Sequence, residues 1–281
     1  MNSPLGLIAG LGDLPVQIAQ AATASGQGVH VLRLKGFEEP KLSAFAGEVV
    51  GIAQIGHVFK AFKKAGCKQI CFAGIVKRPD FSALKPDLKG MAMLPRVLNA
   101  ARRGDDALLR VVVDAFEAEG FEVIGAEEAA GNLRAGEGWL AGPQPDESTI
   151  ADLKKAAQIA LDMGRLDIGQ GTIVCDGLVL CVEAQEGTDE MLRRCASLDE
   201  KLRGSAEAKR GVLVKRPKPM QERRIDLPTI GVKTLDAAAD AGLAGIGFEA
   251  DGTLLVGGQA LLKRAEELGL FLYGFPESWG Q

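Results

Sequence analysis

Residues 211–231 hold the densest group of side chains that could act on phosphate. An apolar run at residues 212–214 predicts a short buried strand that ends at Lys215. Pro217 and Pro219 then exclude a regular helix or a central strand. The loop that follows is rich in charge, with five basic and two acidic side chains: Lys215, Arg216, Lys218, Arg223 and Arg224, with Glu222 and Asp226.

Such a loop suits a polyphosphate ligand. Lysine and arginine neutralise non-bridging phosphate oxygens, and arginine does so with two parallel hydrogen bonds. A carboxylate among them can hold a divalent cation or orient a water molecule. The same residues also fit a solvated basic loop with local ion pairs, and composition alone does not separate these interpretations.

The composition is typical of a soluble globular protein with room for two domains. The chain has 281 residues, of which 47% are hydrophobic and 25% charged. A formal net charge of −4 argues against an overall nucleic-acid binder. No apolar run approaches the roughly 20 residues that span a bilayer, and no basic segment with a long apolar core opens the chain. We therefore expect a cytoplasmic protein with neither a membrane span nor a signal peptide.

Cysteine and histidine usage narrows the chemistry. The chain has five cysteines and two histidines, and no two cysteines form a Cys-x-x-Cys pair. Most of the cysteines lie in or beside apolar runs, so we expect buried, reduced thiols. Two histidines argue against a zinc site and against histidine-based acid–base catalysis. Catalysis should depend on carboxylates, lysines, arginines and a bound metal ion.

The first half of the chain begins with a β-loop-α-β pattern. An apolar run at residues 5–9 is followed by Gly10, Leu11, Gly12 and Asp13, then by a helical pattern from Pro15 and a second strand at residues 29–34. This pattern predicts a parallel, Rossmann-like sheet. The loop fails the dinucleotide fingerprint because Pro15 replaces its third glycine, so we reject NAD. A glycine loop before a helix can still hold a phosphate or a nucleotide edge, although proline at the first helical position also fits on structural grounds alone.

A second loop of this kind follows the strand predicted at residues 69–73. It contains Gly74, Ile75, Lys77 and Arg78. Ligands of open parallel sheets bind beyond the carboxyl ends of the strands, which is where this loop lies. An ordinary basic turn remains the alternative.

Two adjacent aspartates, Asp105 and Asp106, precede a helix predicted to run to residue 119. One aspartate makes a good N-cap, and the second could help hold a cation. A strand at residues 121–125 completes the first domain. We place this domain at residues 1–131, a glycine- and proline-rich linker at 132–146, and a second domain at 147–281.

The second domain is predicted to be a mixed α+β unit. A helix at residues 147–163 leads to a strand at 172–175, the turn residues Asp176 and Gly177, and a returning strand to 183. A second Asp-Gly pair at 251–252 predicts another hairpin. Thr188 and Asp189 begin a further helix, where Thr188 fits either an N-cap or a phosphate contact.

Several short motifs, in order, resemble the LpxI family of UDP-2,3-diacylglucosamine hydrolases of lipid A biosynthesis. None is specific alone, but the ordered set covers nearly the whole chain. The motifs are GLIAGLGDLP at 6–15, AGIVKRP at 73–79, GDDALLR at 104–110, LDIGQ at 166–170, EGTD at 186–189, Gln221 with Arg224, and IDLPTIG at 225–231. One departure is Glu222, where the family pattern usually has an aspartate one methylene shorter.

The resemblance implies a two-domain protein that holds its ligand between the domains. It implies hydrolysis of the pyrophosphate of UDP-2,3-diacylglucosamine to UMP and 2,3-diacylglucosamine 1-phosphate (lipid X), with Mg²⁺ or Mn²⁺ as cofactor. It implies attack by water on the phosphorus nearer the sugar. The scarcity of histidine and the presence of carboxylates also suit magnesium better than zinc.

On this hypothesis, each candidate residue has an expected role. Asp226, to which the family match points, would bind the metal ion or activate water, with Asp105 and Asp106 as further metal ligands. Glu222 is a weaker catalytic candidate, and Lys215 and Arg224 would stabilise charge on the phosphoryl oxygens. The expected substrate-binding residues are Gly10, Leu11, Gly12, Asp13, Gly74, Ile75, Lys77, Arg78, Thr188, Asp189, Gln221, Thr229 and Thr234.

Two other function classes use the same features. A nucleotide-sugar or lipid carrier would bind without chemistry, and a nucleotidyl- or sugar-transferase would need an acceptor. We expect no nucleic-acid partner and a peripheral contact with the cytoplasmic face of the inner membrane, because the expected substrate is a lipid. A homodimer is expected from base rates only.

Overall fold

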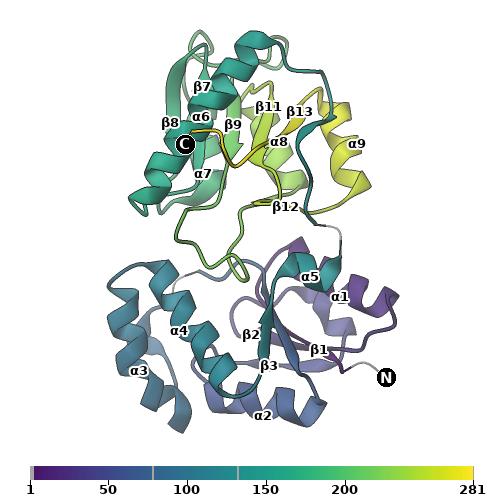
Figure 1. Cartoon of the computed structure of the whole chain (residues 1–281), viewed down its shortest axis with the longest axis vertical. Coiled ribbons are helices and arrows are strands. Elements are labelled where there is room, and N and C mark those ends of the chain that lie inside the picture. Colours follow the sequence, from purple (N-terminus) through teal and green to yellow (C-terminus); the bar gives the residue numbers. More distant parts are fainter. Residues whose placement is uncertain (1–2, 78, 132, 281) are drawn as a thin grey trace. The chain divides into compact units, whose positions relative to one another are not determined.

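The computed structural model describes residues 3–77, 79–131 and 133–280. The chain divides into two compact units (Figure 1). The first comprises Met1–Asn132 with the short segment Glu222–Asp226, and the second comprises Leu133–Gln221 with Leu227–Gln281. Part of the loop predicted to carry the phosphate chemistry therefore belongs to the first unit.

The first unit contains a five-stranded, wholly parallel sheet. Its strand order is β3-β2-β1-β4-β5. The strands are β1 (Leu5–Ala9), β2 (Val29–Leu34), β3 (Gly47–Val50), β4 (Gln69–Ala73) and β5 (Glu122–Ile124). The α-helices are α1 (Asp13–Ala24), α2 (Ile55–Ala65), α3 (Leu88–Ala101), α4 (Asp105–Ala118) and α5 (Ala126–Ala130), and two 3₁₀ turns lie at Pro40–Ala44 and Phe81–Ala83. This confirms the Rossmann-like prediction, and the strand order reverses between β1 and β4.

Helices cover both faces of this sheet. Helices α1 and α5 pack on one face, and α2 and α4 pack on the other (Figure 1). The α2–α4 side is built on aromatic contacts, in which Phe116 meets Phe59 and Phe72 edge to face, at centroid distances of 4.8 and 5.1 Å. Ile225 packs against this cluster and so fastens the Glu222–Asp226 segment to the first unit.

The second unit contains a mixed six-stranded sheet, as predicted. Its order is β6-β13-β11-β9-β7-β8, with β9, β11 and β13 parallel to one another and β6 and β7 antiparallel to their neighbours. The strands are β6 (Gly138–Ala141), β7 (Gly171–Cys175), β8 (Leu178–Val182), β9 (Val212–Lys215), β11 (Gly245–Glu249) and β13 (Phe271–Phe275), and β10 (Thr229–Ile230) pairs separately with β12 (Leu254–Leu255).

The helices of the second unit also lie on both faces of its sheet. Helix α6 (Glu147–Arg165) packs against Val174, Val212 and Val214 on one face. Helices α7 (Gly187–Ala196), α8 (Val232–Asp240) and α9 (Gln259–Leu268) pack on the other, around Leu213 and Ile246. Along β9, valines therefore face α6, while Leu213 and Lys215 face the other three helices.

Two predicted connections differ from the structure. The segment 132–146, predicted to be a linker, contains β6, which pairs with β13 as the edge strand of the second sheet. The Asp-Gly pair at 251–252 makes a turn, but the next strand, β12, pairs with β10 and forms no hairpin with β11. A Cβ on Gly252 would lie 2.5 Å from Glu249 Oε1, so the turn wraps a buried carboxylate instead of reversing the strand. The hairpin at Asp176 and Gly177, which joins β7 to β8, is confirmed.

The five cysteines are free and buried, as predicted. Burial raises the pKa of the Cys71 thiol to about 12, which keeps it protonated at neutral pH. Within the described ranges, no helix is both long and apolar enough to cross a membrane.

Candidate active site

The loops after β1 and β4 join at the point where the strand order of the first sheet reverses. The Gly10 amide donates to Ala73 O at 2.9 Å, and Leu11 and Ile75 exchange two backbone hydrogen bonds of 3.1 and 2.8 Å. Ile75 is 63% exposed, and Lys77 beside it is exposed. In open α/β sheets, ligands bind in the crevice at this switch point. The fold thus brings the two predicted glycine loops together as one accessible surface.

Glycine is required where these loops touch. A Cβ on Gly10 would lie 2.5 Å from Ile75 O, and one on Gly74 would lie 2.8 Å from Leu11 O. Gly74 also has a φ of 95°, which side chains with a Cβ rarely adopt. Gly10 is buried at this contact, whereas Leu11, Gly74 and Ile75 are exposed.

Helix α1 begins at this surface without a side-chain cap. Gly12 is its N-cap residue and donates its amide to Glu39 Oε2 at 3.2 Å. The helix starts at Asp13, so Pro15 is its third residue and not its first, as the sequence pattern suggested. The Asp13 carboxylate pairs with Lys41 at 2.9 Å. Arg78, predicted to act here, lies outside the described residues.

The segment Glu222–Asp226 is held on the N-terminal end of α4. Asp106 is 6% exposed, and its Oδ1 accepts the Glu222 amide at 2.9 Å across 116 residues of sequence. Arg224 donates two hydrogen bonds of 2.9 and 3.0 Å to the Glu222 carboxylate and a third, of 2.6 Å, to Glu117. The Arg224 hydrogen bond holds the pKa of Glu222 below its ordinary value. These contacts fix the backbone that carries Asp226.

The predicted metal ligands lie in the first unit. Asp226 is half-buried, and Asp105 and Asp106 occupy the first turn of α4. The N-cap of that helix is Gly104, so neither aspartate caps it. The described residues contain no group of three or more His, Cys, Asp or Glu side chains placed to hold a metal ion. Magnesium is usually held by one or two carboxylates together with substrate phosphates, so the three predicted aspartates do not form a complete metal site by themselves.

In the second unit, Lys215 ends β9 and is 6% exposed. Its ammonium donates a hydrogen bond to Thr229 O at 3.1 Å. Thr229 therefore orients Lys215 through its backbone carbonyl and not through its hydroxyl. Lys215 lies directly across from Gly171 of β7, which lacks a side chain. Lys215 therefore lies on one side of this glycine.

Glu183 bounds the other side, and the sequence interpretation missed it. It follows β8 and is 6% exposed; its Oε1 accepts the Thr188 hydroxyl at 3.1 Å. Its Oε2 is buried with no hydrogen-bond partner in the structure, and a Cβ on Gly171 would lie 2.3 Å from it. A buried carboxylate oxygen without a donor is costly unless a ligand or water supplies one. The sequence signal that could have identified Glu183 is its position, because it is an acidic residue at the end of an apolar strand and just before the EGTD motif.

Thr188 thus supports Glu183 and is not an N-cap, since the N-cap of α7 is Glu186. Asp189 is exposed in the first turn of α7. Gln221 is buried and bonds Gln170 at 3.3 Å. The Thr234 hydroxyl accepts the Gly231 amide at 3.4 Å and so helps to begin α8.

Other basic residues of the predicted phosphate loop are committed to the protein itself. Arg216 is 2% exposed; it pairs with Glu249 at 2.8 Å and donates to the carbonyl oxygens of Trp279 and Glu277. Lys218 pairs with Asp167 at 2.6 Å. Lys218 therefore makes a local ion pair but is largely buried, and Arg216 is a fully buried structural residue.

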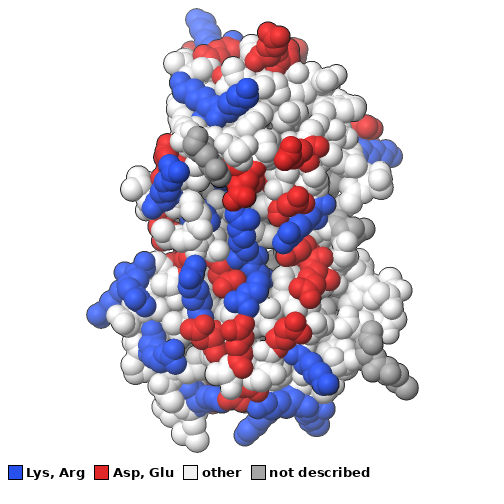
Figure 2. Space-filling view, viewed as in Figure 1, with Lys and Arg blue, Asp and Glu red and all other residues white. Residues whose placement is uncertain are grey.

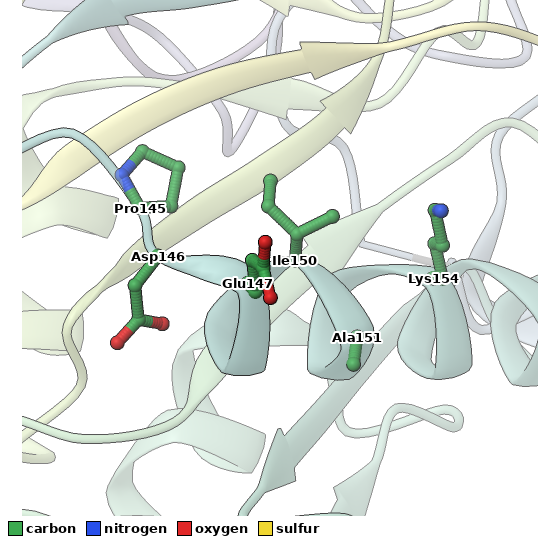
Figure 3. Close-up of a pocket in the computed structure, with 6 residues that line it drawn as sticks. All are labelled: Pro145, Asp146, Glu147, Ile150, Ala151 and Lys154. Atoms are coloured by element: carbon green, nitrogen blue, oxygen red, sulfur yellow. The ribbon is translucent and has the colours of Figure 1, made fainter.

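A separate cavity of about 340 Å³ lies at the start of α6 (Figure 3). Pro145, Asp146, Glu147, Ile150, Ala151 and Lys154 line it. Asp146 caps α6 by accepting the Thr149 amide at 2.8 Å. This cavity contains none of the predicted site residues, and helix capping accounts for its acidic side chain.

Comparison with known proteins agrees with the motif order. The LpxI N-terminal domain model matches residues 4–133, and the LpxI C-terminal domain model matches residues 136–273. The chain is 54% identical over 270 residues to a Caulobacter vibrioides protein named UDP-2,3-diacylglucosamine pyrophosphatase LpxI, and the match covers 96% of each chain. This chain belongs to the LpxI family.

Proposed function

We propose that this protein hydrolyses the pyrophosphate bond of UDP-2,3-diacylglucosamine, giving UMP and 2,3-diacylglucosamine 1-phosphate, in lipid A biosynthesis. The observation that carries the proposal is the 54% identity, over nearly the full length of both chains, to a protein named for this activity. The glycine loops of the first unit, and the buried Lys215 and Glu183 of the second, would supply groups for a diphosphate and its sugar. A cytoplasmic location, with contact at the inner membrane surface, accompanies this proposal.

Each unit contains candidate residues for the proposed reaction. Asp226 would hold Mg²⁺ or Mn²⁺ together with substrate phosphates, because no three carboxylates of the described residues form a metal-binding group. The metal ion would supply Lewis-acid activation of a phosphoryl oxygen or of water. An ammonium has three N–H donors, and Lys215 has one directed at Thr229, so the others can stabilise charge on the departing phosphate. The loops at Gly10–Asp13 and at Gly74–Lys77 would bind uridine or the diphosphate through exposed backbone. Arg224 would act on the phosphoryl oxygens from its fixed position beside Glu222.

The proposal is tested by following UMP release from UDP-2,3-diacylglucosamine. We expect release with Mg²⁺ or Mn²⁺ and its loss, by at least about 10²-fold, when a chelator removes the metal, because a Lewis acid contributes several kcal/mol to such reactions. Restoring Mg²⁺ after chelation is the control for damage to the protein. Tight substrate binding without UMP release under any divalent cation would contradict the proposal and favour a carrier.

Glu183 gives a second test of the site. If its unpaired Oε2 accepts a hydrogen bond from substrate or from the attacking water, then Glu183→Gln should lower kcat/KM about 10- to 100-fold, as expected for one charged hydrogen bond. Glu186→Gln is the matched control, since Glu186 lies on the same loop but pairs with Arg194. Equal rates for Glu183→Gln and the parent would make Glu183 a structural residue.

A further inference from the structure

Helix α3 exposes a strip of apolar side chains. Leu88, Met91 and Leu98 are 84%, 51% and 38% exposed, and exposed Pro95 lies between them. Positions 88, 91, 95 and 98 follow the three- and four-residue spacing of one helix face. The opposite face, with Gly90, Ala100 and Ala101, is buried. The strip is therefore a second apolar face that the first unit does not cover.

A basic hollow adjoins this strip. It lies where α3 packs on α4 and has a volume of about 490 Å³. Its basic lining residues are Arg96 from α3, Arg103 from the turn after α3 and Arg110 from α4, and its acidic lining residue is Asp114. Arg96 lies on α3, and Arg103 follows two residues after its last residue, Ala101. Figure 2 shows basic side chains gathered over the part of the surface where Figure 1 places these helices. Among the described residues, neither Arg96 nor Arg103 has a side-chain ion pair.

The strip and the hollow together match a lipid surface. Residues 85–103 contain Lys85, Lys89, Arg96, Arg102 and Arg103 against the single acid Asp87. Apolar side chains flanked by lysine and arginine insert into the interface of a bilayer, while the cations bind lipid phosphates. Lys89 is paired with Glu119 and is the least available of the five.

We propose that the α3–α4 surface docks the protein on a bilayer that contains anionic lipids, with Leu88 and Met91 inserted and Arg96 and Arg103 on lipid phosphates. A second copy of the chain fits less well, because a symmetric contact would bring two sets of these cations together. The inference rests on the proposed function only for the expectation that the substrate lies in a bilayer. The surface itself is argued from exposure and charge.

The test is flotation of the intact protein with vesicles. Parent protein should float with phosphatidylglycerol–phosphatidylcholine vesicles and not with pure phosphatidylcholine, and added salt should weaken its binding. Leu88→Ser/Met91→Ser and Arg96→Gln/Arg103→Gln should each reduce partitioning about tenfold or more, since each lost cation or inserted side chain weakens attachment severalfold. Leu178→Ser/Val179→Ser, at similarly exposed positions on β8, is the matched control and should float like the parent.

Several outcomes would overturn the proposal. These are a parent protein that does not float with anionic vesicles, a Leu88→Ser/Met91→Ser variant that floats like the parent, and a control that loses binding equally. A parent dimer that this variant converts to monomers would assign the strip to a second copy and also overturn it. UMP release from substrate dispersed in detergent should be unchanged in both α3 variants, so failure of the docking surface and failure of the proposed enzyme activity are separate results.

Discussion

Asp226→Ala should abolish UMP release, lowering the rate by roughly 10³-fold or more, as expected when a group that acts only in the transition state is removed. Asp226 is half-buried in a segment that its neighbours also hold in place. Ile225 packs on the core of the first unit, and the Glu222 amide bonds Asp106. The substitution should therefore remove a carboxylate without releasing the segment.

The measurement is UMP release at saturating Mg²⁺, with substrate binding followed by calorimetry. We expect the alanine variant to keep most of its affinity for the substrate, because the basic and glycine-rich groups remain. Asp162→Ala, which removes an exposed carboxylate on α6, is the control and should act like the parent. A folded Asp226→Ala variant with the parent rate would remove Asp226 from the mechanism.

The fold class could be predicted from the sequence because short local patterns indicate the strands of both sheets. Apolar runs ending in glycine loops, alternating with helical patterns, describe the first unit. The Asp-Gly turn at residues 176–177 identified the antiparallel pair β7–β8. The second Asp-Gly pair failed as a hairpin signal because its turn encloses the Glu249 carboxylate, a tertiary contact that turn chemistry does not reveal.

The candidate site was predictable in its residue types but not in their orientation. Lys215 and Arg216 are neighbours in sequence, and a strand points neighbours to opposite faces. Lys215 faces the α7–α9 side and keeps hydrogen-bond donors for a ligand, whereas Arg216 turns to the α6 side and bonds backbone carbonyls. By residue type alone, both Lys215 and Arg216 are candidate phosphate ligands. Only the register of β9 shows that their side chains point to opposite faces of the sheet.

Long-range contacts account for the remaining differences. Glu222 was a catalytic candidate, but it is clamped by Arg224, and its amide bonds an aspartate 116 residues earlier. The glutamate at position 222, which departs from the expected family pattern, therefore lies in an ion pair with Arg224. Glu183 was missed because its importance comes from Gly171, which lies opposite it only once β7 and β8 pair.

Glu249→Ala should lower the free energy of unfolding of the second unit by about 3–5 kcal/mol, the usual cost of leaving one partner of a buried ion pair uncompensated. Glu249 and Arg216 are each 2% exposed and are joined by a 2.8 Å hydrogen bond. In this variant, Arg216 would keep its hydrogen bonds to backbone carbonyls. It would lose the negative charge of Glu249 while its own side chain remains buried away from water. Because Arg216 also anchors the backbone of Glu277 and Trp279, the C-terminal end of the chain should loosen with it.

Urea unfolding monitored by tryptophan fluorescence suits this test, since Trp279 stacks on Phe275 at a centroid distance of 5.4 Å. Asp236→Ala is the matched control, because Asp236 pairs with Arg264 at the same 2.8 Å while both side chains stay about 40% exposed. Exposed pairs contribute about 0–1 kcal/mol, so the two variants should differ severalfold in their effect on stability. Equal losses would show that water screens the Arg216–Glu249 pair, and Arg216 would again be available to a phosphate ligand.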